Sequence, residues 1–166
     1  MKTTAFFTRM LSWLTGSRLT VDNSVVRDLD LDRFLGSWYE VARFDHFFER
    51  GMSQTKANYV LRDDGNIDVI NTGIKNGKPK TAKGKAKLTD IPSLLRVSFF
   101  GPFYSDYRVM LVDADYRYML IGSGSDGYLW ILSRTPQLAD RDRTAILNEA
   151  KSRGYDTDKL IWVKQN

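Results

Sequence analysis

The polar residues best suited to chemistry lie close together in one short segment, where Glu40 is followed by the single histidine of the chain, His46, and by Glu49. One histidine supplies only one of the three or four ligands of a zinc site, and a Ser-His-Asp triad needs a nucleophile beside it. We therefore expect His46 to be an ordinary loop residue, and we predict no catalytic residue and no metal site.

Glu40 is the second candidate for a functional side chain. It points to the same side as Trp38, since residues two apart in a strand share a face. If Trp38 faces the protein interior, Glu40 is a buried carboxylate that either accepts a structural hydrogen bond or contacts the polar end of a ligand. We favour the structural role, because buried carboxylates usually have a protein partner.

The sequence contains no cysteine, which excludes disulfides, thiol nucleophiles, thiolate metal ligands and a cysteine-linked lipid in this chain. No other motif indicates a bound cofactor. Hydrophobic residues make up 42% and aromatic residues 13% of the chain, which favours strands and a pocket that grips apolar surface.

The net charge of +5 comes largely from one lysine-rich stretch, residues 75–87. Within it Lys83, Lys85 and Lys87 alternate with small residues, which predicts a strand with lysines facing water. A dedicated anion site is the alternative interpretation. No zinc-finger, helix-turn-helix or RNA-binding pattern is present, so we expect no nucleic-acid partner.

Short strand-like runs separated by turn signals fill the centre of the chain. Asp63-Asp64-Gly65-Asn66, Asn76-Gly77 and Asp126-Gly127 are typical hairpin turns. Eight consecutive strands with tight turns predict an all-β fold, an eight-stranded antiparallel up-and-down barrel, a size that leaves room for one small ligand. The predicted strands are 36–45, 54–62, 66–74, 80–89, 94–101, 106–113, 116–123 and 127–134.

The pattern changes after the eighth run. Asp140 can cap a helix that ends near Arg153, where Gly154 supplies a stop, and residues 159–163 form a short extra strand. We expect one domain over residues 29–166, preceded by a leader or flexible segment over residues 1–28. Leu14-Thr15-Gly16-Ser17 resembles a bacterial lipoprotein box with serine in place of the lipidated cysteine.

Three short motifs carry a resemblance to the lipocalin family. Gly36 and Trp38 match the Gly-x-Trp signature of the first lipocalin strand, and Arg134 matches an arginine at the end of the eighth strand. The segment Asp113-Ala114-Asp115-Tyr116 matches the acidic-tyrosine turn, with Asp115 and Tyr116 as its signature residues. The resemblance implies that the Arg134 guanidinium stacks on the Trp38 indole and closes the narrow end of the barrel.

Over residues 30–165 the chain most resembles the bacterial outer-membrane lipocalins related to apolipoprotein D. The matching segments are 42–46, 48–51, 61–65, 97–104 and 128–136. The resemblance implies storage or transport of a fatty acid, phospholipid or lysophospholipid in membrane maintenance. It also implies a location in the cell envelope, peripheral contact with a membrane, and a homodimer in some relatives. Without a cysteine for the anchor, a cytoplasmic location stays open.

Strand alternation identifies the inner wall of the expected cup. Small residues beside large aromatic residues leave space there for a ligand instead of filling it. The candidate ligand-binding residues are Ala42, Phe44, Ala57, Tyr59, Val69, Ala86, Val97, Phe99, Val109 and Trp130.

Two other functions stay open at this point. The first is an enzyme or a haem binder on the lipocalin scaffold, for which His46 would have to face the cavity. The second is a protein-interaction module that uses a hydrophobic rim. The aromatic stretch from Phe99 to Tyr104 is suited to such a rim or to a dimer surface.

Overall fold

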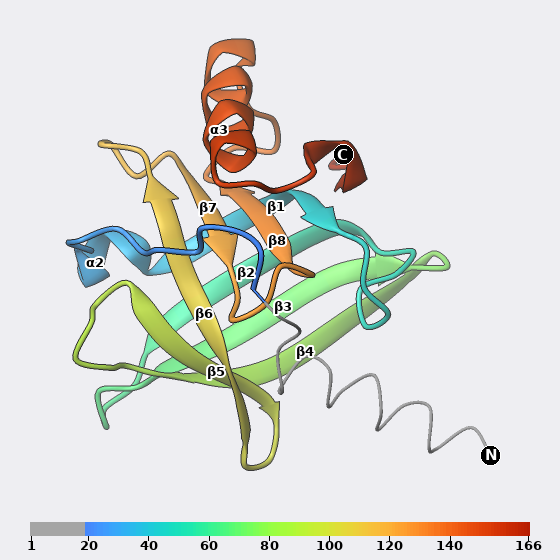
Figure 1. Ribbon diagram of the computed structural model, residues 1–166. Helices are drawn as coiled ribbons and strands as arrows, with labels where there is room; N and C mark the ends of the chain where they lie inside the picture. The colour runs from blue at the N-terminus through green and yellow to red at the C-terminus, as the bar shows by residue number, and fades with distance from the viewer. Residues whose placement is uncertain (1–18) are drawn as a thin grey trace.

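Eight strands wrap into a closed antiparallel barrel in the computed structural model, which describes residues 19–166 (Figure 1). Each of the strands pairs with the next in the chain, and β1 pairs with both β2 and β8 to close the ring. The predicted eight-stranded up-and-down barrel is therefore confirmed. Its strands are β1 (Gly36–Phe44), β2 (Ser53–Leu61), β3 (Ile67–Lys75), β4 (Lys78–Lys87), β5 (Leu94–Phe100), β6 (Phe103–Val112), β7 (Tyr118–Gly122) and β8 (Leu129–Ser133).

Four further elements of residues 19–166 lie outside the ring. A longer helix and a ninth strand follow β8, as the sequence pattern predicts, whereas the one-turn helix before β1 and the 3-10 turn after the longer helix were not expected. They are α2 (Leu31–Phe34), α3 (Asp140–Ser152), η1 (Thr157–Lys159) and β9 (Leu160–Trp162). The expected cap of α3 is wrong by one residue, because the N-cap is Ala139 and Asp140 already lies within the helix.

The turn between β3 and β4 shows how local sequence sets strand register. Asn76 and Gly77 both have positive φ, 52° and 72°. This backbone is typical of a type I′ turn, whose twist matches that of the paired strands. The register that follows places Lys75 opposite Lys78 and Gly73 opposite Lys80.

Strand β1 contains a bulge between Glu40 and Ala42, where its pairing with β8 shifts by one residue. A bulge moves later side chains to the opposite face. Ala42 and Phe44 therefore pack outside the barrel, which corrects the expectation that they line the cup, and Arg43 points inward in their place. Strict alternation could not reveal this change.

Helix α3 stands against the outside of the barrel beside β1, β7 and β8 (Figure 1). Its buried Ile146 and Ala150 pack in one apolar cluster with Phe44 and Ile131. Buried Asp142, on the same helix, accepts hydrogen bonds from Arg117. The molecule thus has two cores, one inside the barrel and one beneath α3.

One edge of β1 is shared by two partners. Its first half, Gly36 to Tyr39, pairs with β2, whereas Ala42 to Phe44 pair with β9. Beyond β9, the Nε2 of Gln165 donates hydrogen bonds to the carbonyl oxygens of Glu40 and Thr55, at 2.8 and 2.9 Å. The C-terminal segment therefore fills the gap between β1 and β2.

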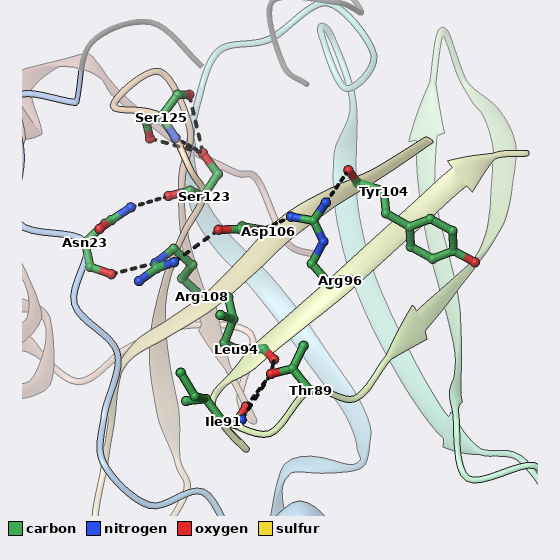
Figure 2. A network of polar contacts seen from close by, with 10 residues as sticks. All are labelled: Asn23, Thr89, Ile91, Leu94, Arg96, Tyr104, Asp106, Arg108, Ser123 and Ser125. Carbon is green, nitrogen blue, oxygen red and sulfur yellow. Dashed lines mark hydrogen bonds and ion pairs between the residues drawn. The ribbon is translucent and has the colours of Figure 1, made fainter. Parts of the chain in front are cut away.

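The segment before α2 runs along the barrel wall, as far as it is described. Residues 1–18, most of the expected leader, lie outside the described residues. Asn23 donates to the Ser123 carbonyl oxygen and accepts from Arg108, and Arg108 pairs with Asp106 (Figure 2). The Val26 amide donates to the Val109 carbonyl oxygen at 2.9 Å. Residues 22–26 are therefore held against β6 and the β7–β8 loop.

The signature residues meet at the closed end of the barrel. The Arg134 guanidinium lies 3.6 Å from the centroid of the buried Trp38 ring and donates to the carbonyl oxygens of Arg33, Leu35 and Ser37. Gly36, with φ +94°, leaves room for this guanidinium 3.4 Å from where a Cβ would stand. Arg134 thus joins β8, α2 and β1 through one planar group.

The turn between β6 and β7 is ordered by Asp113, the first acid of the Asp113-Ala114-Asp115-Tyr116 segment. Asp113 accepts hydrogen bonds from the Asp115 amide and from Arg117, whereas no contact of the Asp115 side chain is found among the described residues. Tyr116, with φ 55°, accepts a hydrogen bond from the Asp30 amide through its hydroxyl. Asp113 and Tyr116 therefore connect this turn to the segment before α2.

Replacing Arg134 with lysine tests the closed end. Lysine keeps the charge but loses the planar group that serves three carbonyl oxygens, so we expect the free energy of unfolding to fall by about 1–3 kcal/mol. Urea unfolding measures this. Arg62→Lys, at exposed ion pairs, is the control and should change stability by less than about 0.5 kcal/mol. Equal effects of the two substitutions would contradict the assigned role.

Candidate ligand-binding cavity

The barrel holds two hollow regions that meet near its open end. The larger, here called the mouth cavity, has a volume of about 370 Å³, and the smaller, the inner cavity, about 80 Å³. Phe48, Glu49, Asn71 and Phe99 line both regions, so they form one continuous cup. Its volume falls within the range of small-molecule sites, about 300–1,000 Å³.

The inner cavity is lined by most of the residues that strand alternation predicted. Six of them reach it: Ala57, Tyr59, Val69, Val97, Phe99 and Trp130. Ala86 and Val109 also face the barrel interior, but they belong to the packed core and line neither cavity. Ala42 and Phe44 lie outside the barrel, as described above.

The mouth cavity is built by a loop that the sequence pattern did not reveal as part of the site. Residues 45–52 connect β1 to β2, and Phe47, Phe48 and Met52 from this loop line the mouth. The hairpin of β3 and β4 supplies the opposite wall, including Lys75 and Lys80. The run of aromatic residues at 47–48 was the available signal, but strand alternation does not extend into loops.

A buried charged group holds the loop in place. Arg43, with a side chain only 2% exposed, donates to Glu40 Oε1 at 3.0 Å and to the Glu49 carbonyl oxygen at 2.8 Å. It also donates to the carbonyl oxygen of Met52 at 3.3 Å. Arg43 therefore connects Glu40, on the inner wall of the barrel, to Glu49 and Met52 of the 45–52 loop. Glu40 has the structural partner expected of it, and it also lines the inner cavity.

His46 completes what we call the inner polar cluster, formed by Glu40, Arg43, His46 and Glu49. Its Nε2 lies 2.6 Å from Glu49 Oε2, and its ring contacts the rings of Phe48 and Trp130. Burial of His46 corrects the expectation of an ordinary loop residue. Its partner Glu49 lies three residues later in the sequence, and the turn of the loop between them brings the two side chains into contact.

The pKa values of the two buried carboxyl groups are shifted in opposite directions. It raises the pKa of Glu40 well above the usual 4.5, and the nearby Glu49 carboxylate raises it further, against the effect of Arg43. Burial also raises the pKa of Glu49, but the hydrogen bond and charge of His46, together with a hydrogen bond to Glu40 and the charge of Arg43, leave that pKa lowered. Glu40 therefore retains a proton more readily, whereas Glu49 is the ionised member of the pair.

Two tyrosines add a neutral polar contact at the same level of the cup. The hydroxyl groups of Tyr59 and Tyr107 are 2.8 Å apart, and burial raises the pKa of both. Trp130 Nε1 donates to Glu49 Oε2 at 3.3 Å. These groups satisfy one another, so the inner cavity offers an apolar wall with a few fixed polar atoms.

Within residues 19–166, no group of three or more histidine, cysteine or acidic residues is placed to hold a metal ion. No helix in this part of the chain is long and apolar enough to cross a membrane. The arrangement is suited to holding an apolar molecule and contains no assembled set of reactive groups.

A closed eight-stranded antiparallel barrel with one apolar cup and an arginine stacked over the tryptophan at its closed end is the architecture of a lipocalin. The sequence profile of the lipocalin-like domain matches residues 29–165, and the chain belongs to this family. Lipocalins bind or transport small hydrophobic ligands, and family membership supports this general function here.

Within the lipocalin family, the chain is similar to bacterial outer-membrane lipoproteins and to apolipoprotein D. The chain is 49% identical over 146 residues to outer membrane lipoprotein Blc of Citrobacter freundii, covering 86% of this chain and 82% of that protein. It is 43% identical over 168 residues to outer membrane lipoprotein Blc of Vibrio cholerae, covering 97% and 98%. Apolipoprotein D of Mus musculus is 31% identical over 152 residues, covering 85% and 79%.

Solved structures agree with the fold. Insecticyanin from the tobacco hornworm Manduca sexta superposes with a TM-score of 0.72 at 22% identity, covering 91% of this chain and 87% of that one. Lobster apocrustacyanin A1 gives a TM-score of 0.71 at 20% identity, covering 91% and 89%. The resemblance to bacterial outer-membrane lipocalins and to apolipoprotein D is thus confirmed.

Substituting Glu40 with glutamine tests the inner polar cluster through pH. A carboxyl group whose pKa is raised by folding stabilises the protein below its unfolded pKa and loses that contribution as pH rises through the folded value. The glutamine variant lacks this loss, so its stability relative to the wild type should increase between about pH 5 and pH 8. Urea unfolding across this range provides the measurement.

Asp63→Asn is the matched control, since it removes a carboxylate from the exposed β2–β3 turn without touching the cup. Its stability difference from the wild type should vary less with pH than that of Glu40→Gln. A Glu40→Gln difference that stays constant or decreases with rising pH would contradict the burial assigned to Glu40.

Proposed function

We propose that this protein binds a single-chain lipid, a fatty acid or a lysophospholipid, with the acyl chain inside the cup and the polar end at the mouth. The observation that carries the proposal is the continuous apolar cup, closed by Trp38 and open between the 45–52 loop and the β3–β4 hairpin. Its limited volume favours one acyl chain over the two chains of a phospholipid.

The expected affinity is adequate for a carrier. Burying about sixteen carbons at ~0.8 kcal/mol per CH₂ gives on the order of 12 kcal/mol before other costs. Association and ordering of both molecules oppose this gain and bring binding to the micromolar range or somewhat tighter. A chain held in this way remains exchangeable, as storage or transport requires.

Binding without catalysis is the function that we propose. A nucleophile next to a base, which an enzyme of this scaffold would need, is not found among the cup residues of the described chain. A haem ligand is disfavoured because the Nε2 of His46 is engaged by Glu49 and His46 lines neither cavity.

We also propose that the protein works in the cell envelope, in maintenance of the membrane. Its bacterial relatives are named outer membrane lipoproteins, although this sequence has no cysteine to carry a lipid. Phe48, Phe100 and Phe103 are exposed large hydrophobic residues near the open end, where a peripheral contact would deliver a lipid to the cup.

Tryptophan fluorescence tests the lipid proposal directly. Trp130 lines the inner cavity, so its emission should change when palmitate or palmitoyl-lysophosphatidylcholine is titrated, and Trp130→Phe should remove most of that change. Mass spectrometry of the natively purified protein should detect retained single-chain lipid. No signal in the titration together with no retained lipid would refute the proposal.

A blocking substitution separates cup binding from surface binding. Ala82→Phe adds a ring at the mouth and should weaken lipid binding by about tenfold or more. Val60→Phe adds a ring on the exposed outer face of β2 and serves as the control. Equal weakening by both variants would place the lipid outside the cup.

A further inference from the structure

Two lysines of the β3–β4 hairpin, Lys75 and Lys80, line the mouth cavity, in contrast to Lys83, Lys85 and Lys87 of β4. Residues 67, 69 and 73 of β3 face inward, and the same alternation brings Lys75 to the mouth. Lys80 lies opposite Gly73 on β4, on the same face, and both lysines line the mouth cavity. Lys83, Lys85 and Lys87 have the opposite parity and face outward, as the sequence predicts.

Neither Lys75 nor Lys80 has an acidic partner among the described residues, and Lys56, a third lysine at the mouth, lies over the Tyr39 ring. Ion pairs in residues 19–166 engage Arg43 at the inner cavity, but none involves Lys75 or Lys80. An apolar cavity with two unpaired ammonium groups on one rim creates a positive potential where a ligand enters. The remaining walls of the mouth carry no compensating acid except Glu49, which is already paired with His46.

A buried hydroxyl lies beside the lysines. Thr55 lines the mouth cavity, its side chain is almost completely buried, and its Oγ1 has no hydrogen-bond partner among the described residues. Its Cγ2 would lie 2.9 Å from a Cβ on Gly73, so Thr55 packs directly over Gly73, the residue that pairs with Lys80. Buried hydroxyls without partners are uncommon, so Oγ1 needs a hydrogen-bond acceptor that the described residues do not supply.

The inner end of the cup has the opposite character. Glu40 and Glu49 line the inner cavity, and Arg43 is already bonded to Glu40 and to loop carbonyl oxygens. An anion placed there would meet carboxyl groups and no uncommitted cation. The two ends of the cup therefore select opposite ends of an amphipathic ligand.

We propose that Lys75, Lys80 and the Thr55 hydroxyl form a subsite for the anionic end of a single-chain lipid, a carboxylate or a phosphate monoester. This inference rests on the proposed function and specifies the headgroup that the mouth selects. The two ammonium groups attract the anion, and the Thr55 side chain turns its hydroxyl toward the mouth to donate a hydrogen bond to one of the anion's oxygens. The acyl chain then extends past Phe99 toward Trp130.

The test compares ligands that differ only in the anionic group. Palmitoyl-lysophosphatidate and monopalmitoylglycerol share an acyl chain and a glycerol, and only the first carries a phosphate; palmitate supplies the carboxylate. Each is titrated into the wild type, Lys75→Gln/Lys80→Gln and Lys83→Gln/Lys85→Gln, the last being the matched control with outward lysines. Trp130 fluorescence reports binding, and circular dichroism confirms that each variant is folded.

The mouth variant should bind lysophosphatidate and palmitate about three- to tenfold more weakly, as expected for partly exposed charge pairs. Its affinity for monopalmitoylglycerol should change by less than about twofold, and the outward variant should leave all three affinities unchanged. Thr55→Val, a substitution of similar shape, should weaken only the anionic ligands.

Each contrary result overturns a distinct statement. If the mouth and outward variants weaken binding of the anionic lipids equally, the effect is due to net charge alone. If the mouth variant weakens binding of monopalmitoylglycerol as much as that of the anionic lipids, Lys75 and Lys80 have a structural role instead. Failure of all three lipids to bind the wild type would refute the proposed function itself, whereas binding of all three without dependence on Lys75 and Lys80 would refute only the subsite.

Two further arms distinguish the source of the anion. Sodium phosphate should displace lysophosphatidate no better than sodium chloride of the same ionic strength, because free phosphate lacks the acyl chain. Sedimentation with phosphatidylglycerol vesicles should be unaffected by the mouth substitutions. Strong displacement by phosphate would make this a free-phosphate site, and loss of vesicle binding alone would make it a membrane contact.

Discussion

The bulge in β1 is the feature on which the interior and exterior of the barrel both depend. Before it, β1 directs Trp38 and Glu40 inward; after it, Arg43 takes the inward position and Phe44 turns toward α3. A single extra residue thus supplies both the cation that holds the 45–52 loop and the apolar patch beneath the helix. Without the shift, a phenylalanine would occupy the cup and a charged side chain would lie under α3.

The sequence was sufficient for the fold because its signals are local and repeated. Asn76-Gly77 sets a hairpin register that alternation then extends along both strands, and Trp38 and Arg134 identify the two strands that meet at the closed end. The site was harder to predict. The bulge leaves no signature in the alternation, so Phe44 was placed inside, and the return of the loop that buries His46 depends on contacts with Arg43.

The cup is chemically uneven along its length. Its inner end holds acids, an arginine, a histidine and two tyrosines in contact with one another, and its middle is apolar. Its mouth has lysines without acidic partners. Such a gradient would give a lipid of the proposed kind one favoured orientation, since its chain and its headgroup would meet different surroundings. The lipocalin fold by itself accounts for the cup, whereas the orientation of a ligand in the cup depends on these particular side chains.

The shared edge of β1 has a consequence for how the protein is made. The gap between β1 and β2 near the mouth is filled by β9 and Gln165, which emerge from the ribosome after all eight barrel strands. The rim between β1 and β2 is therefore incomplete until the C-terminal residues have been synthesised. Contacts between residues so distant in sequence are slow to form. During translation the unfinished rim would present apolar surface and unpaired strand edges, which makes this stage the one most exposed to aggregation.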